Sequence, residues 1–234
     1  MTNIIKARYD SVKNKVFTGA VRLSFPNLYE TATDTLGNDT GKYTICMLIP
    51  KSDKLCYAAL NEAIDHVIKE KFNGKTPKGL RLPIKDGDEQ AEKSGRDETK
   101  DCWVVNAGSP NQPGVVDQYA KEILTKEERD ALERKAQVDP IAAKKLEEIS
   151  SLTDRDVYAG CWVRVTLNAF EWGLTKKNPG GVGISFSLQN VQKVRDDESF
   201  SGRVKASKEF EALESEEEDS DEEAQLARLT GSKR

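Results

Sequence analysis

Aromatic and basic side chains alternate with small aliphatic ones along residues 157–172, VYAGCWVRVTLNAFEW. Successive side chains of a β-strand point to opposite faces, so the odd positions predict a buried aliphatic face. The opposite face carries four rings and one guanidinium, those of Tyr158, Trp162, Arg164, Phe170 and Trp172. Unpaired bases stack on exposed rings while Arg and Lys follow the phosphates. The pattern predicts a groove for single-stranded nucleic acid, with packing under another segment or in a dimer interface as the alternative.

Basic residues elsewhere are predicted to line the same groove. Arg22 falls on the outward face of the first expected strand, Lys42 begins the second, and Lys176 and Lys177 occupy a hairpin tip. The net charge over 157–195 is +4. Basic residues concentrated on a segment with outward aromatics indicate a nucleic-acid surface. Together with Trp103 of a short strand, the candidate nucleic-acid-binding residues are Arg22, Lys42, Trp103, Tyr158, Trp162, Arg164, Phe170, Trp172, Lys176 and Lys177.

Patterns that would support catalysis are weak. The Gly-rich segment NPGGVGIS precedes a strand rather than a helix and lacks G-K-[ST], so it does not cradle phosphates. Asp86 and Asp88 are typical of a metal-dependent nuclease, but they fall in an expected flexible loop without a matching carboxylate. His66 is the one histidine and is expected to be an exposed helix residue. We predict no catalytic activity, no cofactor and no metal site.

Cysteine usage and hydropathy narrow the class of protein further. The four cysteines never form a C-x-x-C pair, and reduced, buried thiols are the expectation. No apolar run approaches the roughly 18–20 residues that span a bilayer, and the N-terminal segment lacks the apolar core of a signal peptide. These features predict an intracellular protein without a membrane partner.

Alternating patterns predict the strands that position these residues. Residues 17–25 form a half-buried strand in which Phe17, Val21, Leu23 and Phe25 point inward, and a second strand, apolar on both faces, follows at 43–50. Shorter strands are expected at 102–106 and near 115–119. Residues 157–172 are long for one strand, so a bend is expected at Gly160. A partner strand at 183–194 completes a hairpin.

Helices are expected in two places. A stripe of apolar residues predicts a helix over 53–71, with Ser52 as its cap. Thr125 with Glu128 forms a capping box, and Asp139 followed by Pro140 starts another helix, so residues 125–150 read as a helical insertion. Residues 73–101 are rich in Gly, Lys and Asp and are predicted to be a long flexible loop.

The two parts of the chain carry net charges of opposite sign. Ten acidic residues fall within 209–223 with no basic residue among them, so residues 209–234 carry −7 while residues 1–208 carry +3. A like-charge block repels itself and is predicted to be a disordered tail, next to a DNA-binding domain over 1–208. Such a tail either competes for the anionic ligand of the basic body or only keeps the protein in solution.

The block VYAGCWVRVTLNAFEW, the block NPGGVGISFSLQNVQKVRDDESFSGR and the opening FTGAVRLSFPNLYE resemble a family of tailed-phage single-stranded DNA-binding proteins. The resemblance covers most of 16–208 and implies a mainly β fold, a five-stranded oligonucleotide/oligosaccharide-binding (OB) barrel. It also implies sequence-independent binding of single strands in phage DNA replication and recombination, in the cytoplasm of the infected bacterial host, with an acidic tail that contacts replication partners. By position it places Arg22, Lys42, Trp162, Arg164 and the Lys176–Lys177 tip toward DNA.

Two features depart from the family pattern. The helix at 53–71 follows the second strand, whereas the usual OB helix lies between the third and the fourth, so the topology is a variant or a strand is missing from the assignment. The tail ends in basic residues, QLARLTGSKR, where related tails often end in an apolar tip. That difference weakens the case for docking to a polymerase or helicase.

Two rival functions remain open at this stage. A non-catalytic adaptor of the replication machinery would use the aromatic face to dock a protein partner, or a second copy of the chain. A metal-dependent nuclease or recombination enzyme would cleave labelled single strands when Mg²⁺ or Mn²⁺ is present. Titration with single-stranded oligonucleotides separates the adaptor from the DNA-binding hypothesis, since tryptophan fluorescence is expected to be quenched with a steep salt dependence only if the chain binds DNA.

Overall fold

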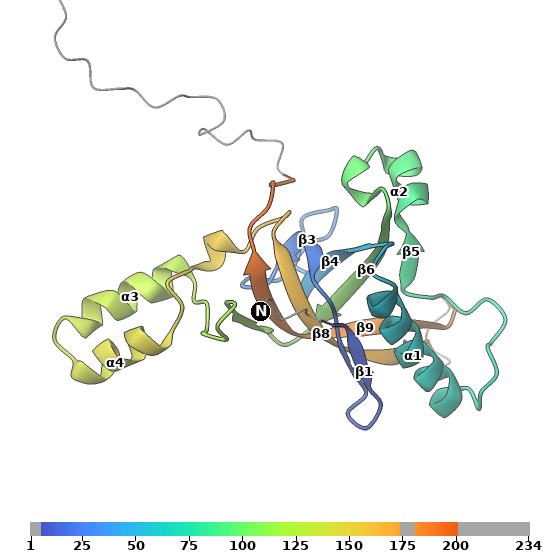
Figure 1. Cartoon of the computed structure of the whole chain (residues 1–234), viewed down its shortest axis with the longest axis horizontal. Coiled ribbons are helices and arrows are strands. Elements are labelled where there is room, and N and C mark those ends of the chain that lie inside the picture. The colour runs from blue at the N-terminus through green and yellow to red at the C-terminus, as the bar shows by residue number, and fades with distance from the viewer. Residues whose placement is uncertain (1–5, 174–180, 201–234) are drawn as a thin grey trace, which may run out of the picture. The chain divides into compact units, whose positions relative to one another are not determined.

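The computed structural model describes residues 6–173 and 181–200, which lie in one compact unit, residues 1–201. Figure 1 shows a mainly β fold with a few helices. The elements in chain order are β1 (Arg8–Asp10), β2 (Lys15–Phe17), β3 (Val21–Asn27), β4 (Tyr43–Pro50), α1 (Lys54–Lys71), β5 (Ile84–Asp86), α2 (Gly87–Ser94), η1 (Asp97–Thr99), β6 (Cys102–Ser109), β7 (Gly114–Val116), α3 (Lys126–Ala136), α4 (Pro140–Glu148), η2 (Asp154–Asp156), β8 (Trp162–Trp172) and β9 (Gly183–Arg195).

Five of the strands close into a barrel, as the resemblance implied. Their order is β3, β4, β6, β9 and β8, and the pairing of β8 with β3 completes the ring. β6 and β9 run parallel, while the other neighbouring pairs are antiparallel. If the five barrel strands are numbered 1 to 5 along the chain, their order around the barrel is 1-2-3-5-4. This is the strand order of an OB fold.

The position of α1 is a variation of this topology and does not reflect a missed strand. α1 follows the second barrel strand and packs against β1, β2 and β8, while α3 and α4 lie between the third and the fourth barrel strands. The expected cap of α1 was wrong by one residue. The Asp53 carboxylate, not Ser52, accepts a hydrogen bond from the Cys56 backbone N–H. A carboxylate at this position satisfies a donor that the helix itself leaves free.

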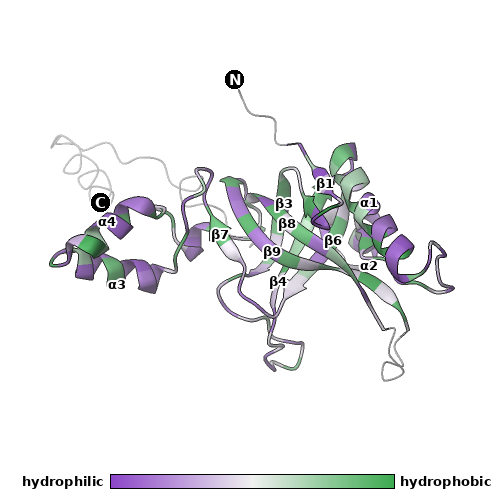
Figure 2. Cartoon of the chain, turned by 90° about the horizontal axis from the view of Figure 1, so that it is seen from below, coloured by the Kyte–Doolittle hydropathy of each residue, from purple (hydrophilic) through white to green (hydrophobic). Residues whose placement is uncertain are grey.

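The core of the barrel follows the alternation of β8 and β9. Val163, Val165, Leu167 and Ala169 are buried, as are Ile184, Phe186 and Leu188 on the partner strand, which confirms the predicted inward faces. The apolar side of α1 joins the same core through Leu60, Ala63, Ile64 and Val67. Figure 2 shows the contrast with α3 and α4, which are largely hydrophilic. No α3 residue is buried within the described chain.

The predicted single strand over 17–25 was wrong. Two strands, β2 and β3, pair with β8 at separate places, and Val16 rather than Phe17 is buried. Phe25 was expected inward but is 61% exposed. Its φ of +46° and a register shift between Ser24 and Asn27 explain the change. An extra residue in a strand reverses the face to which the following side chains point.

Residues 73–101 contain β5, α2 and η1, so the long flexible loop was also wrong. Asp86 caps α2 by accepting from the Asp88 N–H. Lys51 binds both carboxylates, with its Nζ at 2.7 Å from Asp86 Oδ1 and 2.6 Å from Asp88 Oδ2. Hydrogen bonds to Lys51 lower the pKa of both carboxyl groups. The ion pairs of Lys51 with Asp86 and Asp88 tie this segment to the end of β4. Such ion pairs leave no periodic pattern in the sequence, so they could not be predicted from it.

The start of β8 also differs from the prediction. The strand begins at Trp162 rather than at 157, because Gly160 turns the chain with a φ of +110°. This left-handed backbone favours glycine. The helices of the insertion agree with their sequence signals, since Thr125 and Glu128 form the capping box and Pro140 follows the Asp139 cap. All four cysteines are free thiols.

Candidate nucleic-acid interface

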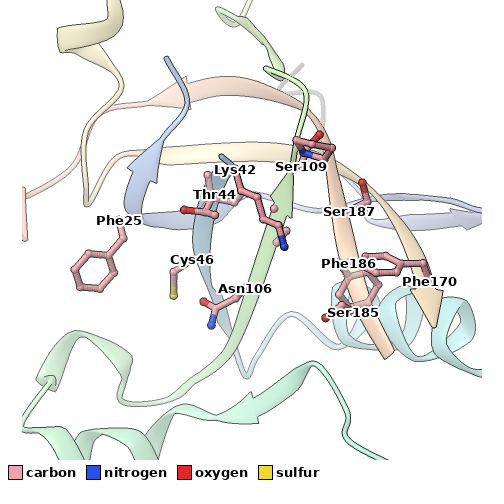
Figure 3. Close-up of a pocket in the computed structure, with 14 residues that line it drawn as sticks. Phe25, Lys42, Thr44, Cys46, Asn106, Ser109, Phe170, Ser185, Phe186 and Ser187 are labelled. Carbon is pink, nitrogen blue, oxygen red and sulfur yellow. The ribbon is translucent and has the colours of Figure 1, made fainter. Parts of the chain in front are cut away.

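A groove with a volume of about 760 Å³ crosses the outer face of the barrel. Figure 3 shows its lining residues, which come from the strands β3, β4, β6, β8 and β9, with Lys42 just before β4 and Pro110 just after β6. They are Phe25, Lys42, Thr44, Ile45, Cys46, Asn106, Ala107, Gly108, Ser109, Pro110, Phe170, Ser185, Phe186 and Ser187. β4 and β6 are the second and third barrel strands, the face with which OB folds bind oligonucleotides.

Two exposed phenylalanines border the groove. Phe25 and Phe170 are 61% and 41% exposed and lie on opposite sides of it (Figure 3). The bulge in β3 turns Phe25 outward, and the Arg96 guanidinium carbon lies 4.7 Å from the centre of its ring. Phe170 lies on the even face of β8 and pairs with Ser185. Large apolar rings at the rim of a groove offer π-faces to unpaired bases.

Small polar side chains form much of the floor between these rings. Thr44 pairs with Gly108 across β4 and β6, and Ser187 pairs with Gly108 across β6 and β9. A Cβ at Gly108 would lie 3.3 Å from both the Thr44 methyl carbon and the Tyr43 carbonyl oxygen, so the absence of a side chain keeps this part of the floor open. Hydroxyl and amide groups supply hydrogen bonds without imposing a sequence code.

The charge of the groove suits an anionic ligand. Lys42 is the one charged residue among the described lining residues, and none of these is acidic. Cys46 also lies in the floor, but burial raises the pKa of its thiol, so it stays protonated at neutral pH. A protonated thiol is a poor nucleophile. The described lining of the groove therefore presents a neutral thiol and no thiolate.

Trp162 and Arg22 lie in a separate cluster on the outer face. Arg22 on β3 and Arg195 on β9 both pair with Trp162 on β8, and their guanidinium carbons lie 5.9 and 4.4 Å from the centre of the indole ring. Both distances are within the range of cation–π contacts. The indole Nε1 donates to Asp197 Oδ2 at 2.6 Å. One side of the predicted stacking surface is thus occupied by the protein itself.

Residues 196–200, which we call the strap, lead from β9 across this cluster. Arg22 donates from Nη2 to the Glu198 carbonyl oxygen at 2.6 Å, and the Tyr158 hydroxyl donates to the Asp197 carbonyl oxygen at 2.9 Å. The Phe200 ring lies 4.5 Å from the Arg22 guanidinium carbon. Phe200 also packs on a small apolar cluster formed by Cys46, Leu48 and Val104. Cys46 links this cluster to the groove.

Three further predicted site residues, Trp103, Trp172 and Arg164, are not among the residues that line the groove. Trp103 stacks on Tyr57 of α1 at a centroid separation of 4.8 Å, and Trp172 covers Gly183 at the end of the β8–β9 hairpin. Arg164 lies near Phe17, and its Nε is buried without a hydrogen-bond partner among the described residues. Lys176 and Lys177 lie outside the residues that the structure describes. Lys42 and Phe170 are the predicted residues that line the groove.

Sequence reasoning missed most of the groove. Pro26 was the available signal for Phe25, because a proline within a strand pattern marks an edge or a bulge. Ser185 and Ser187 were expected on the outward face of their strand, but small hydroxyl residues carry no distinct binding signal. Thr44 and Asn106 lie on neighbouring strands, and only the strand pairing brings them together with the serines.

The described part of the chain contains neither a cluster of metal ligands nor a helix that could cross a membrane. Across residues 6–173 and 181–200, no group of three or more His, Cys, Asp or Glu side chains could hold a metal ion. The carboxylates of Asp86 and Asp88 are bound to Lys51. Among the helices of these residues, none combines the length and the apolar composition that a bilayer crossing requires.

Comparison with known proteins agrees with this geometry. Residues 14–223 match the family model described as the ssDNA-binding protein of Enterobacter phage Enc34. Protein p50 of Acyrthosiphon pisum secondary endosymbiont phage 1 is 26% identical over 215 residues, which cover 88% of this chain and 97% of p50.

Solved structures agree at the level of the fold. The single-stranded DNA-binding protein from bacteriophage Enc34 is similar with a TM-score of 0.54 at 26% identity, over 85% of this chain and 91% of that chain. The same phage protein in complex with ssDNA is similar with a TM-score of 0.58 at 24% identity, over 86% and 99% of the two chains. Because the family model matches most of its length, the chain belongs to the family of phage single-stranded DNA-binding proteins described for Enterobacter phage Enc34.

Proposed function

We propose that this protein binds single-stranded DNA independently of sequence and that the groove between Phe25 and Phe170 is its primary binding surface. One observation carries the proposal: two exposed rings border a groove whose described lining contains one lysine and no carboxylate. Bases stack on the rings, and Lys42 neutralises a phosphate. The family of phage single-stranded DNA-binding proteins and the ssDNA complex of the Enc34 protein support the same ligand.

The chemistry of the floor accounts for the lack of sequence preference. Thr44, Asn106, Ser185 and Ser187 carry short polar side chains that accept and donate hydrogen bonds. Every base has a π-face, so stacking on Phe25 and Phe170 does not discriminate among bases. Each such contact is worth roughly 1–3 kcal/mol by alanine substitution. Two rings and a cation therefore provide useful affinity without a base-specific code.

We further propose a role in phage DNA replication and recombination, in the cytoplasm of the infected bacterial host, where the protein protects and organises single strands. It acts without catalysing a reaction, since Cys46 is protonated and the Asp86–Asp88 pair is bound to Lys51. The acidic segment 209–223 contacts replication proteins or competes with DNA for the basic body. That segment lies outside the described residues.

Oligothymidine titration tests the proposal. Wild-type protein is expected to bind and to raise the fluorescence anisotropy of a dye-labelled oligothymidine, and affinity is expected to fall in Phe25→Ala, Phe170→Ala and Lys42→Ala. Tyr119→Ala is a matched control, because Tyr119 is an exposed aromatic residue outside the groove. Failure of the wild-type protein to bind, or equal weakening by the control, would contradict the proposal.

A non-catalytic adaptor of the replication machinery is the second candidate. The observation in its favour is the exposure of Val138 and Ile141 on the α3–α4 hairpin, apolar side chains that a protein partner would cover. Replacing both residues with serine separates the two functions. If the hairpin docks a protein and the groove binds DNA, oligothymidine affinity stays at the wild-type value while binding of the replication partner is lost.

A further inference from the structure

We propose that the surface beneath the strap is a second subsite for single-stranded DNA and that residues 196–200 occupy it when DNA is absent. The subsite would take a phosphate beside Trp162, between Arg22 and Arg195, and a base on the apolar cluster where Phe200 lies. The inference rests on the proposed function and extends it, because it assigns a ligand to a surface that the groove does not include.

The carboxylate of Asp197 stands where a phosphate would lie. Its Oδ2 accepts from Trp162 Nε1 at 2.6 Å and lies 4.0 Å from Arg22 Nη2 and 3.8 Å from Arg195 Nη1. Two guanidinium groups and an indole N–H converging on one oxygen form a binding site for an oxyanion. Arg22 and Arg195 come from the two strands that flank Trp162, so the barrel itself holds these groups in place.

The ring of Phe200 stands where a base would lie. One contact is the Arg22 guanidinium, whose carbon is 4.5 Å from the ring centre. The other is the apolar cluster of Cys46, Leu48 and Val104 on the outer face of β4 and β6. A guanidinium beside an apolar platform is the arrangement on which unpaired bases stack. The Asp197 carboxylate and the Phe200 ring are three residues apart in the strap. The strap therefore places a negative charge and an aromatic ring where a nucleotide would place its phosphate and its base.

The subsite continues the groove along the same strands. Cys46 belongs to the lining of the groove and also to the cluster under Phe200. Ser24 pairs with Cys46, and Arg22 pairs with Leu48, so the subsite lies one pleat repeat further along β3 and β4. A strand leaving the groove past Phe25 therefore meets Arg22 and the Phe200 position next. DNA long enough to pass this point would displace the strap.

The contacts of the strap are compatible with displacement. Phe200 N donates one backbone hydrogen bond to Ala159 O. Arg22 and Tyr158 donate the hydrogen bonds to strap carbonyl oxygens described above, and Lys193 forms an ion pair with Asp196 at 2.9 Å. Arg22 Nε also donates to Gly160 O at 3.0 Å, so its guanidinium stays oriented when the strap leaves. The strap follows the last barrel strand, and its release leaves the pairing of the barrel unchanged.

The experiment compares a short and a long oligothymidine. One OB fold binds about 4–16 nucleotides of a single strand. An oligomer of about 5 nucleotides is therefore expected to fill the groove alone, and one of about 20 nucleotides to fill the groove and the subsite. Asp197→Asn keeps an acceptor for Trp162 but removes the charge, and Phe200→Ala removes the ring. Both variants are expected to raise affinity for the long oligomer about 3- to 10-fold, a change of roughly 0.6–1.4 kcal/mol. Affinity for the short oligomer is expected to stay unchanged, and Asp65→Asn is the control for the loss of one surface charge.

A second readout reports on Trp162 directly. In a Trp103→Phe, Trp172→Phe protein, Trp162 is the one remaining tryptophan, and its fluorescence is expected to be quenched by the long oligomer but not by the short one. Equal or lower affinity of the strap variants for the long oligomer, measured well below their melting temperatures so that both are folded, would overturn the second subsite. Loss of short-oligomer binding by the wild-type protein would instead overturn the proposed function, so the two failures are distinguishable.

Discussion

The indole Nε1 of Trp162 donates a hydrogen bond to Asp197 Oδ2 at 2.6 Å, joining the first residue of β8 to the segment that follows β9. A tryptophan that its sequence context favours as an exposed stacking platform is thereby held by an internal carboxylate. The open groove lies further along the barrel, between Phe25 and Phe170. The two surfaces that we propose for DNA therefore differ: the groove is open, whereas the surface around Trp162 is covered by residues 196–200.

Removal of either ring at the rim of the groove is expected to weaken DNA binding. Phe170→Ala and Phe25→Ala each lose one stacking contact of roughly 1–3 kcal/mol, which corresponds to about a 5- to 150-fold rise in Kd for a short oligothymidine. The fluorescence anisotropy of a dye-labelled short oligothymidine measures the change. Tyr119→Ala should leave Kd within twofold of wild type, and a similar loss in this control would show that the effect is unspecific.

Lys42→Ala is expected to change the salt dependence of binding. Each phosphate that a cation neutralises on a single strand contributes about 0.7 to the slope of log K against log salt. Titrations at several salt concentrations should therefore give a slope that is smaller by about 0.7 in the variant. Lys54→Ala, an exposed lysine on α1, serves as the control. An unaltered slope in Lys42→Ala would remove Lys42 from the phosphate path.

Deletion of residues 209–234 is expected to tighten binding to single strands at low salt. The deleted segment carries a net charge of −7, and under the competition proposal it occupies the basic body in place of DNA. The gain should shrink as salt is added, because screening weakens the internal competition as well. Affinity that is unchanged or weaker after the deletion would refute competition and leave solubility as the role of the tail.

The Trp162–Asp197 contact predicts a pH-dependent stability. The hydrogen bond from Trp162, with the Glu198 N–H and the guanidinium groups of Arg22 and Arg195, lowers the pKa of Asp197. A carboxyl group with a lowered folded-state pKa stabilises the fold above its unfolded pKa of about 3.9. That contribution is lost as pH falls through the folded-state value.

Melting temperatures of wild type and Asp197→Asn test this. The wild type should melt higher at neutral pH, and the difference should disappear in acid. Four other titratable groups lie near this carboxylate: Tyr158, Lys193, Asp196 and Glu198. Both proteins contain all four, so the difference in melting temperature reports on Asp197. A difference in melting temperature that is independent of pH would contradict the assignment.

Leu167→Ala tests the assignment of the barrel core. Leu167 is fully buried at the centre of β8, and truncation of a buried leucine costs about 2–5 kcal/mol. Urea unfolding is expected to show this loss in the free energy of unfolding. Thr166→Ala, at the neighbouring outward position, should change it by less than about 1 kcal/mol. Equal effects at the two positions would show that the alternation of β8 does not define the core.

Local patterns were sufficient for much of the fold. The buried face of β8 follows from strict alternation over Val163, Val165, Leu167 and Ala169, because a pleated strand sends every second side chain to the same side. The capping box at Thr125 and the Asp139–Pro140 start are also local, since each satisfies backbone donors within one turn. The barrel itself was expected from the resemblance carried by the blocks around β8 and β9.

Other features required contacts between distant parts of the chain. The segment 84–99 is ordered by Lys51, which lies more than thirty positions before Asp86 and Asp88. Phe25 faces outward because a bulge against β4 breaks the alternation of β3. Neither the Lys51 ion pairs nor the bulge in β3 repeats along the sequence. A pattern of apolar and polar residues therefore predicts neither.

By itself, the sequence determined which residue types are available for DNA: aromatic rings on alternate strand positions, scattered cations and an acidic segment at 209–223. The tertiary structure decided which of them meet. Closure of the barrel brings Phe25, Lys42 and Phe170 to one groove, and the strap places Asp197 on Trp162. The physical reason is that alternation specifies the face of a strand, whereas strand pairing, bulges and ion pairs specify which faces become neighbours.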